Sequence, residues 1–370
     1  MTDPLAGASV RFGPEIFRVQ THGGVSRYIV ELHRGLLGRG VDSEIVAGLH
    51  RSALLDGVPG VCGGRMTAVA GDRFRQAVTK AVDEPLAAWA ARRLAPGDVW
   101  HPSYFPRRLP GPGGPITVIT VYDMIHERYP EAVSPRDDTI ARKAAACRSA
   151  DLVLCISHDT ADDAAERLGL DRGRLVVTHL GVSPVEPAEV TAPAGGAPYL
   201  VSVGERGAPH KNWPTVLRAL AAVRADDLHL VCIGAPLTAA EHASIAAAGL
   251  TGRVRAMAAS DTELAGVLRG AVGLVYPSRY EGFGLPPLEA LAQGCPVVAS
   301  DVGAIREVVG GIALLVEPTV EGVAAGIDRL LAGGQDVERQ RRDGPAHAAR
   351  FSWEATVDAT VAAYRTALDR

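Results

Sequence analysis

The stretch GLVYPSRYEGFGLPPLEALAQGCPVVAS (residues 273–300) predicts a strand, a glycine loop, a helix and a second strand in direct succession. Its apolar runs at 273–278 and 296–300 are typical of strands that are buried on both faces. Pro286 and Pro287 suit the first turn of a helix, where their missing N–H groups are not needed. Two buried strands joined by a helix form the basic unit of a parallel sheet.

The same alternation of Val- and Ile-rich runs with Ala-rich segments extends along most of the chain. The other strands are expected at 41–48, 115–123, 151–157, 174–181, 198–204, 228–234 and 253–257. Helices are expected at 25–38, 137–149, 158–168, 212–225, 238–248, 261–269, 286–293, 303–309, 320–332 and 352–368. This order predicts an α/β protein with parallel sheets that are covered by helices on both faces.

A segment rich in proline and glycine, residues 181–198, interrupts this alternation and predicts an interdomain linker. We therefore expect two doubly wound, Rossmann-like domains, residues 1–185 and 196–351, facing each other across a cleft. A C-terminal helix at about 352–370 is expected to pack back on the first domain. Ligands of such sheets bind at the carboxyl ends of the strands. The absence of a G-x-G-x-x-G fingerprint disfavours a nicotinamide or flavin cofactor.

The bulk composition excludes several classes of partner. A net charge of −4 argues against nucleic acid, which normally needs a basic surface. The five scattered cysteines form no C-x-x-C pair, so disulfides and zinc are disfavoured and a cytoplasmic setting is expected. No apolar run is long enough to span a bilayer. Residues 73–95 form a basic amphipathic pattern, for which a solvated surface helix is favoured over contact with a membrane.

Two glutamates flank the glycine turn of the quoted stretch, Glu281 in the loop and Glu289 early in the helix. A phosphate placed directly between two carboxylates would be repelled, so these groups are better suited to accept hydrogen bonds from pairs of hydroxyls. The alternative for Glu289 is an acid that stabilises the positive end of the helix dipole. That alternative leaves the Tyr-Glu-Gly-Phe-Gly turn unexplained.

Backbone donors lie between the two carboxylates. The N–H groups of Phe283, Gly284 and Leu285 gather at the expected helix start, where the helix dipole favours an anion. Gly282 and Gly284 let a ligand approach the backbone closely. A nucleotide diphosphate sugar has diols at both ends and phosphates in the middle, so it is the ligand class that fits this pattern.

The motif EGFGLPPLE resembles the E-x7-E signature of the retaining GT-B glycosyltransferases of family 4. The resemblance covers nearly the whole chain and extends to GGVSRY (23–28), VYDMIHERYPE (121–131), ADLVLCISHDT (150–160) and PHKN (209–212). It implies the GT-B fold and transfer of a hexose, with retention, from a nucleotide diphosphate sugar to a hydroxyl acceptor. The acceptor class stays open among glycans, lipid-linked glycans and small molecules. It also implies a reaction without a metal or other cofactor, which agrees with the lack of a D-x-D motif at a strand end.

The same resemblance implies roles for the two glutamates and their loop. Glu289 would bind the ribose hydroxyls of the donor. Glu281 and the backbone of residues 282–285 would hold the hexose.

A second loop, VSVGERGAPHKN (201–212), places cationic residues between a strand and a helix start. Arg206 and Lys211 are candidates to reach a diphosphate and to balance the charge of the leaving group, a role that the resemblance also implies. Glu205 occupies the position that some family members give to arginine. The alternative is that both cations are solvated surface charges.

The N-terminal half contributes three further candidates. Gly23 and Gly24 precede an amphipathic helix and could carry N–H groups to the diphosphate, although a plain strand-to-helix turn is the alternative. Asp123 follows a buried strand and is a candidate to contact the acceptor or the sugar, with a capping aspartate as the alternative. Tyr122 replaces a histidine that many family members carry here.

The motifs YEGFGLPPLEA and YDM resemble mannosyltransferase-like branches, so GDP-mannose is the first expectation for the donor and a UDP-hexose the second. Two alternatives remain for the activity. A nucleotide-sugar 2-epimerase can share the two-domain plan without an acceptor. A non-catalytic nucleotide-sugar binding protein would keep Glu281, Glu289 and Lys211 for binding alone.

Overall fold

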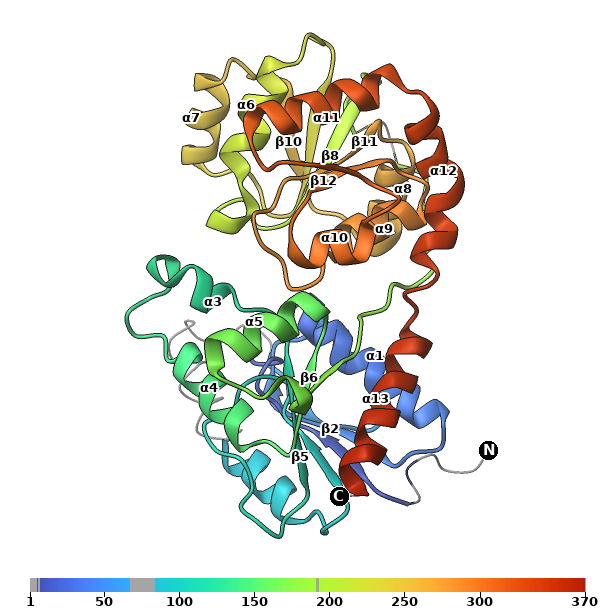
Figure 1. Cartoon of the computed structure of the whole chain (residues 1–370). Helices are drawn as coiled ribbons and strands as arrows, with labels where there is room; N and C mark the ends of the chain where they lie inside the picture. Colours follow the sequence, from blue (N-terminus) through green and yellow to red (C-terminus); the bar gives the residue numbers. More distant parts are fainter. Residues whose placement is uncertain (1–4, 6, 67–83, 191–192, 370) are drawn as a thin grey trace. The chain divides into compact units, whose positions relative to one another are not determined.

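The computed structural model describes residues 5, 7–66, 84–190 and 193–369, and the chain divides into two compact units. Unit 1 contains residues 1–127, 133–181 and 353–370, and unit 2 contains residues 128–132 and 182–352. The boundary at residues 181 and 182 falls within the segment that is rich in proline and glycine. Each unit is built on its own sheet (Figure 1).

Unit 1 contains a seven-stranded sheet in which the strands run in the order β3-β2-β1-β4-β5-β6-β7. All neighbouring strands are parallel. The strands are β1 (Val10–Phe12), β2 (Ser43–His50), β3 (Val61–Arg65), β4 (Val99–His101), β5 (Ile116–Val121), β6 (Leu152–Cys155) and β7 (Leu175–Val177). The sequence did not predict the short strands β1, β3 and β4.

The helices of unit 1 include one from the far end of the chain. The longer ones that the structure describes in full are α1 (Gly24–Gly38), α4 (Thr139–Ser149), α5 (His158–Leu168) and α13 (Trp353–Leu368), and the short α3 (Ile125–Arg128) lies where the residues of the two units meet in the chain. Helix α13 packs beside α1 (Figure 1), and the contact is so close that a Cβ on Gly35 would lie 2.4 Å from Val357. The Tyr364 hydroxyl of α13 lies 2.6 Å from Nδ1 of His101 on β4. Helix α13 is therefore part of the core of unit 1.

Unit 2 contains a six-stranded parallel sheet in the order β10-β9-β8-β11-β12-β13. The strands are β8 (Tyr199–Val203), β9 (His229–Ile233), β10 (Val254–Met257), β11 (Gly273–Tyr276), β12 (Val297–Ser300) and β13 (Leu314–Val316). The quoted stretch forms β11, a loop, a helix and β12, as predicted. Strand β13 was not predicted.

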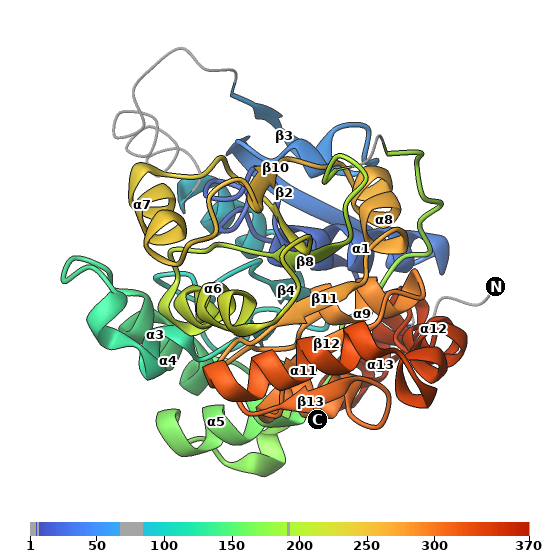
Figure 2. The ribbon, with the colours of Figure 1, turned by 90° about the horizontal axis from the view of Figure 1, so that it is seen from above.

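Helices cover both faces of the second sheet. They are α6 (Trp213–Ala222), α7 (Ala239–Ala247), α8 (Asp261–Arg269), α9 (Leu285–Ala292), α10 (Gly303–Val309), α11 (Val320–Ala332) and α12 (Gln335–Ala348). Helix α6 packs against α11, whereas α9 packs against α8 and α12, and Figure 2 shows β8 and β11 between α6 and α9. Leucine, valine, isoleucine and alanine make up most of the core between the sheet and α6, as the low aromatic content requires. The two sheets confirm the prediction of two Rossmann-like domains.

Both sheets reverse their strand order at one point. The reversal lies between β1 and β4 in unit 1 and between β8 and β11 in unit 2. The chain leaves the two strands at such a point in opposite directions, which opens a crevice at their carboxyl ends. These two crevices are the places where the fold is most able to accept a ligand.

Two observations concern contact with a membrane: the structure of the basic segment 73–95 and the character of the helices. Residues 84–92, in the basic segment 73–95, are helical, and the first part of that segment lies outside the described residues. None of the helices in the described part of the chain combines the length and the apolar character that a membrane span needs.

Candidate functional site

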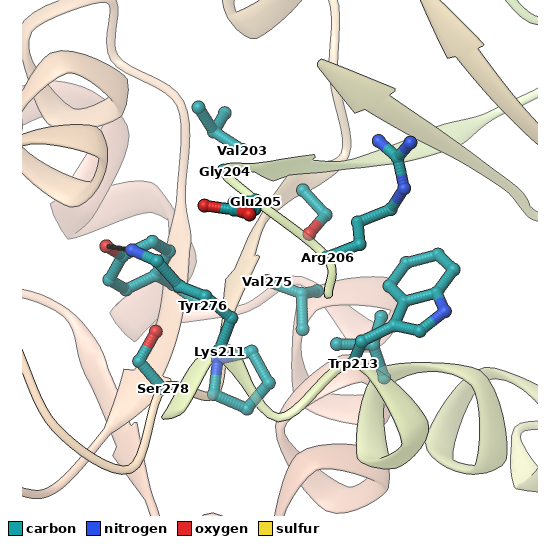
Figure 3. Close-up of a pocket in the computed structure, with 12 residues that line it drawn as sticks. Val203, Gly204, Glu205, Arg206, Lys211, Trp213, Val275, Tyr276 and Ser278 are labelled. Atoms are coloured by element: carbon teal, nitrogen blue, oxygen red, sulfur yellow. Dashed lines mark hydrogen bonds between the residues drawn. The ribbon is translucent and has the colours of Figure 1, made fainter. Parts of the chain in front are cut away.

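A hollow lies at the strand reversal of unit 2, at the carboxyl ends of β8 and β11 (Figure 3). Its walls come from the end of β8, the loop after it, the start of α6 and the end of β11. The lining residues are Ser202, Val203, Gly204, Glu205, Arg206, Lys211, Trp213, Val216, Val275, Tyr276, Pro277 and Ser278. Two predicted residues, Lys211 and Arg206, are among them.

The backbone at Asn212 fixes the direction of Lys211. Asn212 has a φ of 58°, a left-handed conformation that asparagine tolerates better than most residues. Its side-chain amide donates to the carbonyls of Pro277, at 3.1 Å, and Pro318, at 2.9 Å. The amide oxygen accepts from the Thr215 hydroxyl at 2.8 Å. These bonds fix the turn before α6, and they therefore also fix the backbone position of the neighbouring Lys211.

The Lys211 ammonium is held between two oxygens. Its Nζ donates to Oε1 of Glu281 at 2.7 Å and to the hydroxyl of Tyr276 at 3.0 Å. Burial opposes the charge, but the neighbouring Tyr276 and Glu281 outweigh it and raise the pKa of Lys211. Burial and the Glu281 carboxylate raise the pKa of Tyr276. Lys211 is therefore an ammonium at neutral pH, and the alternative of a solvated surface charge does not describe it.

The loop after β11 leads into α9 through a backbone that needs glycine. Gly284 precedes the helix with a φ of 106°, and no side chain caps the helix start. Pro286 and Pro287 lack N–H groups, so Gly284 and Leu285 carry the backbone donors of this helix end. The side chains of Glu281 and Phe283 are buried beside this turn. The arrangement offers a ligand two N–H groups next to a carboxylate.

Glu289 lies in the second turn of α9, at its fifth residue. The helix-dipole effect falls off within the first turn, and the first turn of α9 contains no acid. The alternative that Glu289 serves only as an N-terminal acid therefore loses most of its physical basis. Its predicted contact with a ribose diol stays a prediction.

Arg206 takes a different direction from Lys211. In Figure 3 its side chain extends above Trp213, whereas Lys211 runs to the Tyr276 ring. Its Nε donates to Oε1 of Glu241 at 2.6 Å, and the guanidinium carbon lies 6.0 Å from the centre of the Trp213 ring. Burial opposes ionisation of Glu241, but bonds from Arg206 and Thr238 outweigh it and lower the pKa of that carboxyl. Arg206 and Lys211 thus share one hollow but have separate partners.

The three remaining candidates belong to unit 1. Asp123 follows β5, and its Oδ1 accepts from the N–H of Ile125 at 3.0 Å, as the capping alternative expects. Its carbonyl accepts from the buried Lys143 ammonium at 2.8 Å. Among the described residues, no hydrogen bond to its other carboxylate oxygen, Oδ2, is found. Asp123 is therefore fixed in place, and a sugar or acceptor contact remains a prediction.

Gly23 and Gly24 form the start of α1, which has no side-chain cap on Gly23. The side chain of Gln20 accepts from the N–H of Ser26, at 3.2 Å, and from its hydroxyl, at 2.8 Å. A Cβ on Gly23 would lie 2.3 Å from Oε1 of Gln20. Gly23 is thus required for the close approach of Gln20, and the first-turn donor of Ser26 is already in use.

Two residues that bind the cations of the hollow, Tyr276 and Glu241, were not predicted from the sequence. Tyr276 is the last residue of β11, and the apolar pattern of this strand predicted an ordinary core residue rather than a hydroxyl that contacts Lys211. Glu241 belongs to a capping box, T-x-x-E, and this motif could have been found at residues 238–241. Its contact with Arg206, 35 residues away, gave no sequence signal.

Comparison with known proteins agrees with this geometry. Two Rossmann-like domains in one chain are the architecture of the GT-B glycosyltransferases. Family models match both halves: "Glycosyltransferase Family 4" over residues 22–186 and "Glycosyl transferases group 1" over residues 197–333. A D-inositol 3-phosphate glycosyltransferase from Geodermatophilus obscurus is 31% identical over 94% of this chain and 85% of that protein. The chain belongs to glycosyltransferase family 4.

Other relatives match over shorter stretches. An MMP alpha-(1->4)-mannosyltransferase from Mycolicibacterium hassiacum is 33% identical over 59% of this chain. The O-antigen chain mannosyltransferase B of Escherichia coli is 42% identical over 28% of this chain. These matches span 54% and 28% of the two relatives, so the chain covers about half or less of their length.

Solved structures share the fold over almost the full length. Sucrose-phosphate synthase from Thermosynechococcus elongatus superimposes with a TM-score of 0.75 at 21% identity, covering 97% of this chain and 98% of that chain. The Anabaena protein HepE, in complex with UDP and glucose, gives a TM-score of 0.72 at 18% identity, covering 95% and 97%.

Proposed function

We propose that this protein transfers a hexose from a nucleotide diphosphate sugar to a hydroxyl acceptor, with retention and without a metal ion. The observation that carries the proposal is the Lys211 ammonium, 2.7 Å from Glu281 and 3.0 Å from the Tyr276 hydroxyl. It lies at the strand reversal where sheets of this kind bind nucleotides. Family membership supports the same reaction class.

Lys211 suits the leaving diphosphate. A group that stabilises charge as it develops must be charged already and fixed in place. The neighbouring Tyr276 and Glu281 raise the pKa of Lys211, so its charge is present at neutral pH, and the two bonds fix its direction. Together with the backbone donors of Gly284 and Leu285, it would take the role that a divalent ion has in other transferases.

Glu281 suits the hexose. Its carboxylate is largely buried and uses Oε1 for Lys211. A carboxylate has about four lone-pair sites on its two oxygens, so Glu281 can accept sugar hydroxyls while it keeps this ion pair. Glu289, in the helix α9 that follows this loop, would accept hydrogen bonds from the ribose diol.

The proposed reaction proceeds on one face of the sugar. The bond from the anomeric carbon to the diphosphate oxygen breaks, and the acceptor oxygen bonds to the same face of that carbon. The acceptor proton passes to the departing phosphate oxygen. A double displacement would need an enzyme carboxylate as nucleophile. The proposal assigns Glu281, the carboxylate of this loop, to the hexose hydroxyls and not to that nucleophile.

GDP-mannose is the first choice of donor. The support comes from the names of two relatives, a mannosyltransferase from Mycolicibacterium hassiacum and one from Escherichia coli. A UDP-hexose is the second choice.

Calorimetric titration with GDP-mannose, UDP-glucose, dTDP-glucose and ADP-glucose tests the proposal. One of these should bind, and turnover with an acceptor panel should persist in EDTA, with the anomeric configuration kept in the product by NMR. Loss of activity in EDTA that manganese restores would refute the metal-free mechanism. Isomerised sugar without any acceptor would favour the 2-epimerase, and tight binding with no turnover would favour the binding protein. Failure of all four donors to bind would reject the proposal as a whole.

A further inference from the structure

The guanidinium of Arg206 is held on one side only. Its Nε donates to Oε1 of Glu241 at 2.6 Å. Its Nη2 donates to the carbonyls of Ala235, at 2.7 Å, and Pro236, at 3.1 Å, and approaches Oε2 of Glu241 at 3.5 Å. Within the described residues, no bond from Nη1 is recorded. The donors on that nitrogen are therefore available to a ligand.

The open edge faces the carboxyl ends of two strands. A Cβ placed on Gly234, directly after β9, would lie 3.9 Å from Nη1 and 3.8 Å from the carbonyl oxygen of Gly204, directly after β8. Gly204 and Gly234 have φ values of 127° and 141°, which side chains disfavour. Gly234 thus puts no side chain beside Nη1, and Gly204, which lines the hollow, lies next to the same position.

Glu241 uses both carboxylate oxygens. Oε2 accepts from the N–H and hydroxyl of Thr238, at 2.7 Å and 2.9 Å, and so caps α7. Oε1 accepts from Arg206. The pair is nearly buried, with 7% of the Arg206 side chain and 13% of the Glu241 side chain exposed. Glu241, which caps α7 in the connection after β9, therefore also fixes the side chain of Arg206.

We propose that Glu241 is a positioning residue for the nucleotide, because it locks Arg206 so that only the Nη1 edge is offered to an oxygen of the donor diphosphate. An arginine that is fixed in advance loses less conformational freedom when it binds. The inference rests on the proposed function, since it concerns the same donor. It differs from a direct contact in that Glu241 never touches the ligand.

The chain contains a matched control. Helix α8 begins with the same capping box, in which Oε2 of Glu263 accepts from the N–H and hydroxyl of Ser260, at 2.8 Å and 2.7 Å. Glu263 has no arginine partner among the ion pairs of the described residues. Glu263→Gln removes the cap charge alone, whereas Glu241→Gln also weakens the hold on Arg206.

A double-mutant cycle tests the proposal by calorimetry with GDP and UDP. Whichever nucleoside diphosphate binds the wild type should bind Glu241→Gln and Arg206→Met each about tenfold more weakly. The double variant should be no weaker than Arg206→Met alone, because Glu241 acts through Arg206. The corresponding nucleoside, which lacks phosphates, should bind all variants equally. Glu263→Gln should bind the diphosphate like the wild type.

Three results would overturn the inference. Glu241→Gln could bind the diphosphate as tightly as the wild type, or more tightly, in which case Glu241 would compete with the ligand for Arg206. The losses of the two single variants could also add up in the double variant. Circular dichroism and thermal melts of all four variants identify any that fail to fold, and Glu241→Asp then serves as the second variant, with an intermediate loss expected. If the wild type binds neither GDP nor UDP, the proposed function is contradicted as well. If the wild type binds one of them but the variants do not behave as expected, only the positioning role fails.

Discussion

The two strand reversals of this molecule have the same topology but opposite chemistry. In unit 1, between β1 and β4, the protein's own groups pair with one another. Oε2 of Glu15 accepts from the N–H and hydroxyl of Ser103, at 3.0 Å and 3.2 Å, and the ring nitrogens of His101 contact Tyr364 and Thr120 at 2.6 Å and 2.8 Å. In unit 2, between β8 and β11, the Lys211 ammonium and the Tyr276 hydroxyl line a hollow, and the Glu281 carboxylate accepts from the ammonium.

The contrast also appears in the charges. Burial raises the pKa of Glu15 and lowers the pKa of His101 to about 3, so both groups of unit 1 are shifted toward their neutral forms. In unit 2 the pKa of Lys211 is raised, which maintains its charge. Topology therefore sets where a crevice can form, but the residues that follow each strand decide whether the groups beside it are shifted toward neutral or toward charged forms.

The largest effect is expected from removing the cation of the unit 2 reversal. Lys211→Ala should lower kcat by about a hundredfold or more, because a preorganised charge on a leaving group is worth that much. Arg218→Ala, an exposed cation on α6, is the control for loss of a positive charge. Steady-state kinetics of both variants checks this. If kcat is unchanged in Lys211→Ala, the charge at the unit 2 reversal has no role in catalysis, and the contrast with unit 1 has no functional meaning.

The next effect separates the two glutamates. Glu289→Gln should weaken nucleoside diphosphate and nucleotide sugar alike, by at least about tenfold, because charged hydrogen bonds contribute about 1.5–3 kcal/mol. Glu281→Gln should bind the bare diphosphate as tightly as the wild type or more tightly, since Lys211 loses its competing carboxylate. It should lose affinity for the sugar donor. Calorimetry with both ligands decides, and equal losses of bare-diphosphate binding in the two variants would contradict this division.

A smaller effect is expected from the hydroxyl that orients Lys211. Tyr276→Phe removes one bond to the ammonium and should lower kcat by about two- to tenfold with little change in KM, in line with about 0.5–1.5 kcal/mol per hydrogen bond. Tyr199→Phe is the matched control, since Tyr199 is a buried tyrosine of the same sheet whose hydroxyl donates to the Val267 carbonyl at 2.8 Å. An equal loss of kcat in both variants would indicate a general effect on the sheet rather than on Lys211.

The smallest effect concerns Glu15, at the strand reversal of unit 1. Burial raises the pKa of Glu15 above its usual value of 4.5, so the folded protein binds this proton more readily than the unfolded chain does. The associated stabilisation is present at low pH and is lost as the pH rises through the folded-state pKa. The wild type should therefore gain stability relative to Glu15→Gln as the pH falls from 7 toward 4.5.

Urea unfolding at several pH values measures that difference. Glu166→Gln, an exposed carboxylate on α5, gives the background effect of removing an acidic charge from the same unit. A stability difference that moves in the opposite direction with pH would show that Glu15 is stabilised as a carboxylate. Ligand binding should not change in either variant.

Much of the fold could be predicted from local pattern. The quoted stretch predicted strands at 273–278 and 296–300 with a helix at 286–293, and the structure has β11 (Gly273–Tyr276), α9 (Leu285–Ala292) and β12 (Val297–Ser300). The strands β1 and β4 contain only three residues each, too few for any periodicity to appear. Helix α12 was not predicted because its sequence is mostly polar and contains Pro345.

The site could be predicted residue by residue but not as an arrangement. Motifs singled out Lys211 and Glu281 separately, yet the bond between them joins positions 70 residues apart. Arg206 was assigned together with Lys211 because both are cations of one loop. Its partner Glu241 comes from the next crossover, and only the folded backbone brings the two together.

The position of α13 has a consequence for synthesis on the ribosome. Most of unit 1 precedes unit 2 in the chain, but α13, which contacts α1 and β4, is translated after unit 2. Until residues 353–370 leave the exit tunnel, the face of α1 around Gly35 lacks Val357, and His101 lacks its Tyr364 partner. The first half of the chain must therefore wait, with apolar surface uncovered, while all of unit 2 is made. Domains normally fold in order from the N-terminus onward. Here α13 completes the unit whose synthesis started first, so a chain that stops before residue 353 contains all of unit 2 but an incomplete unit 1.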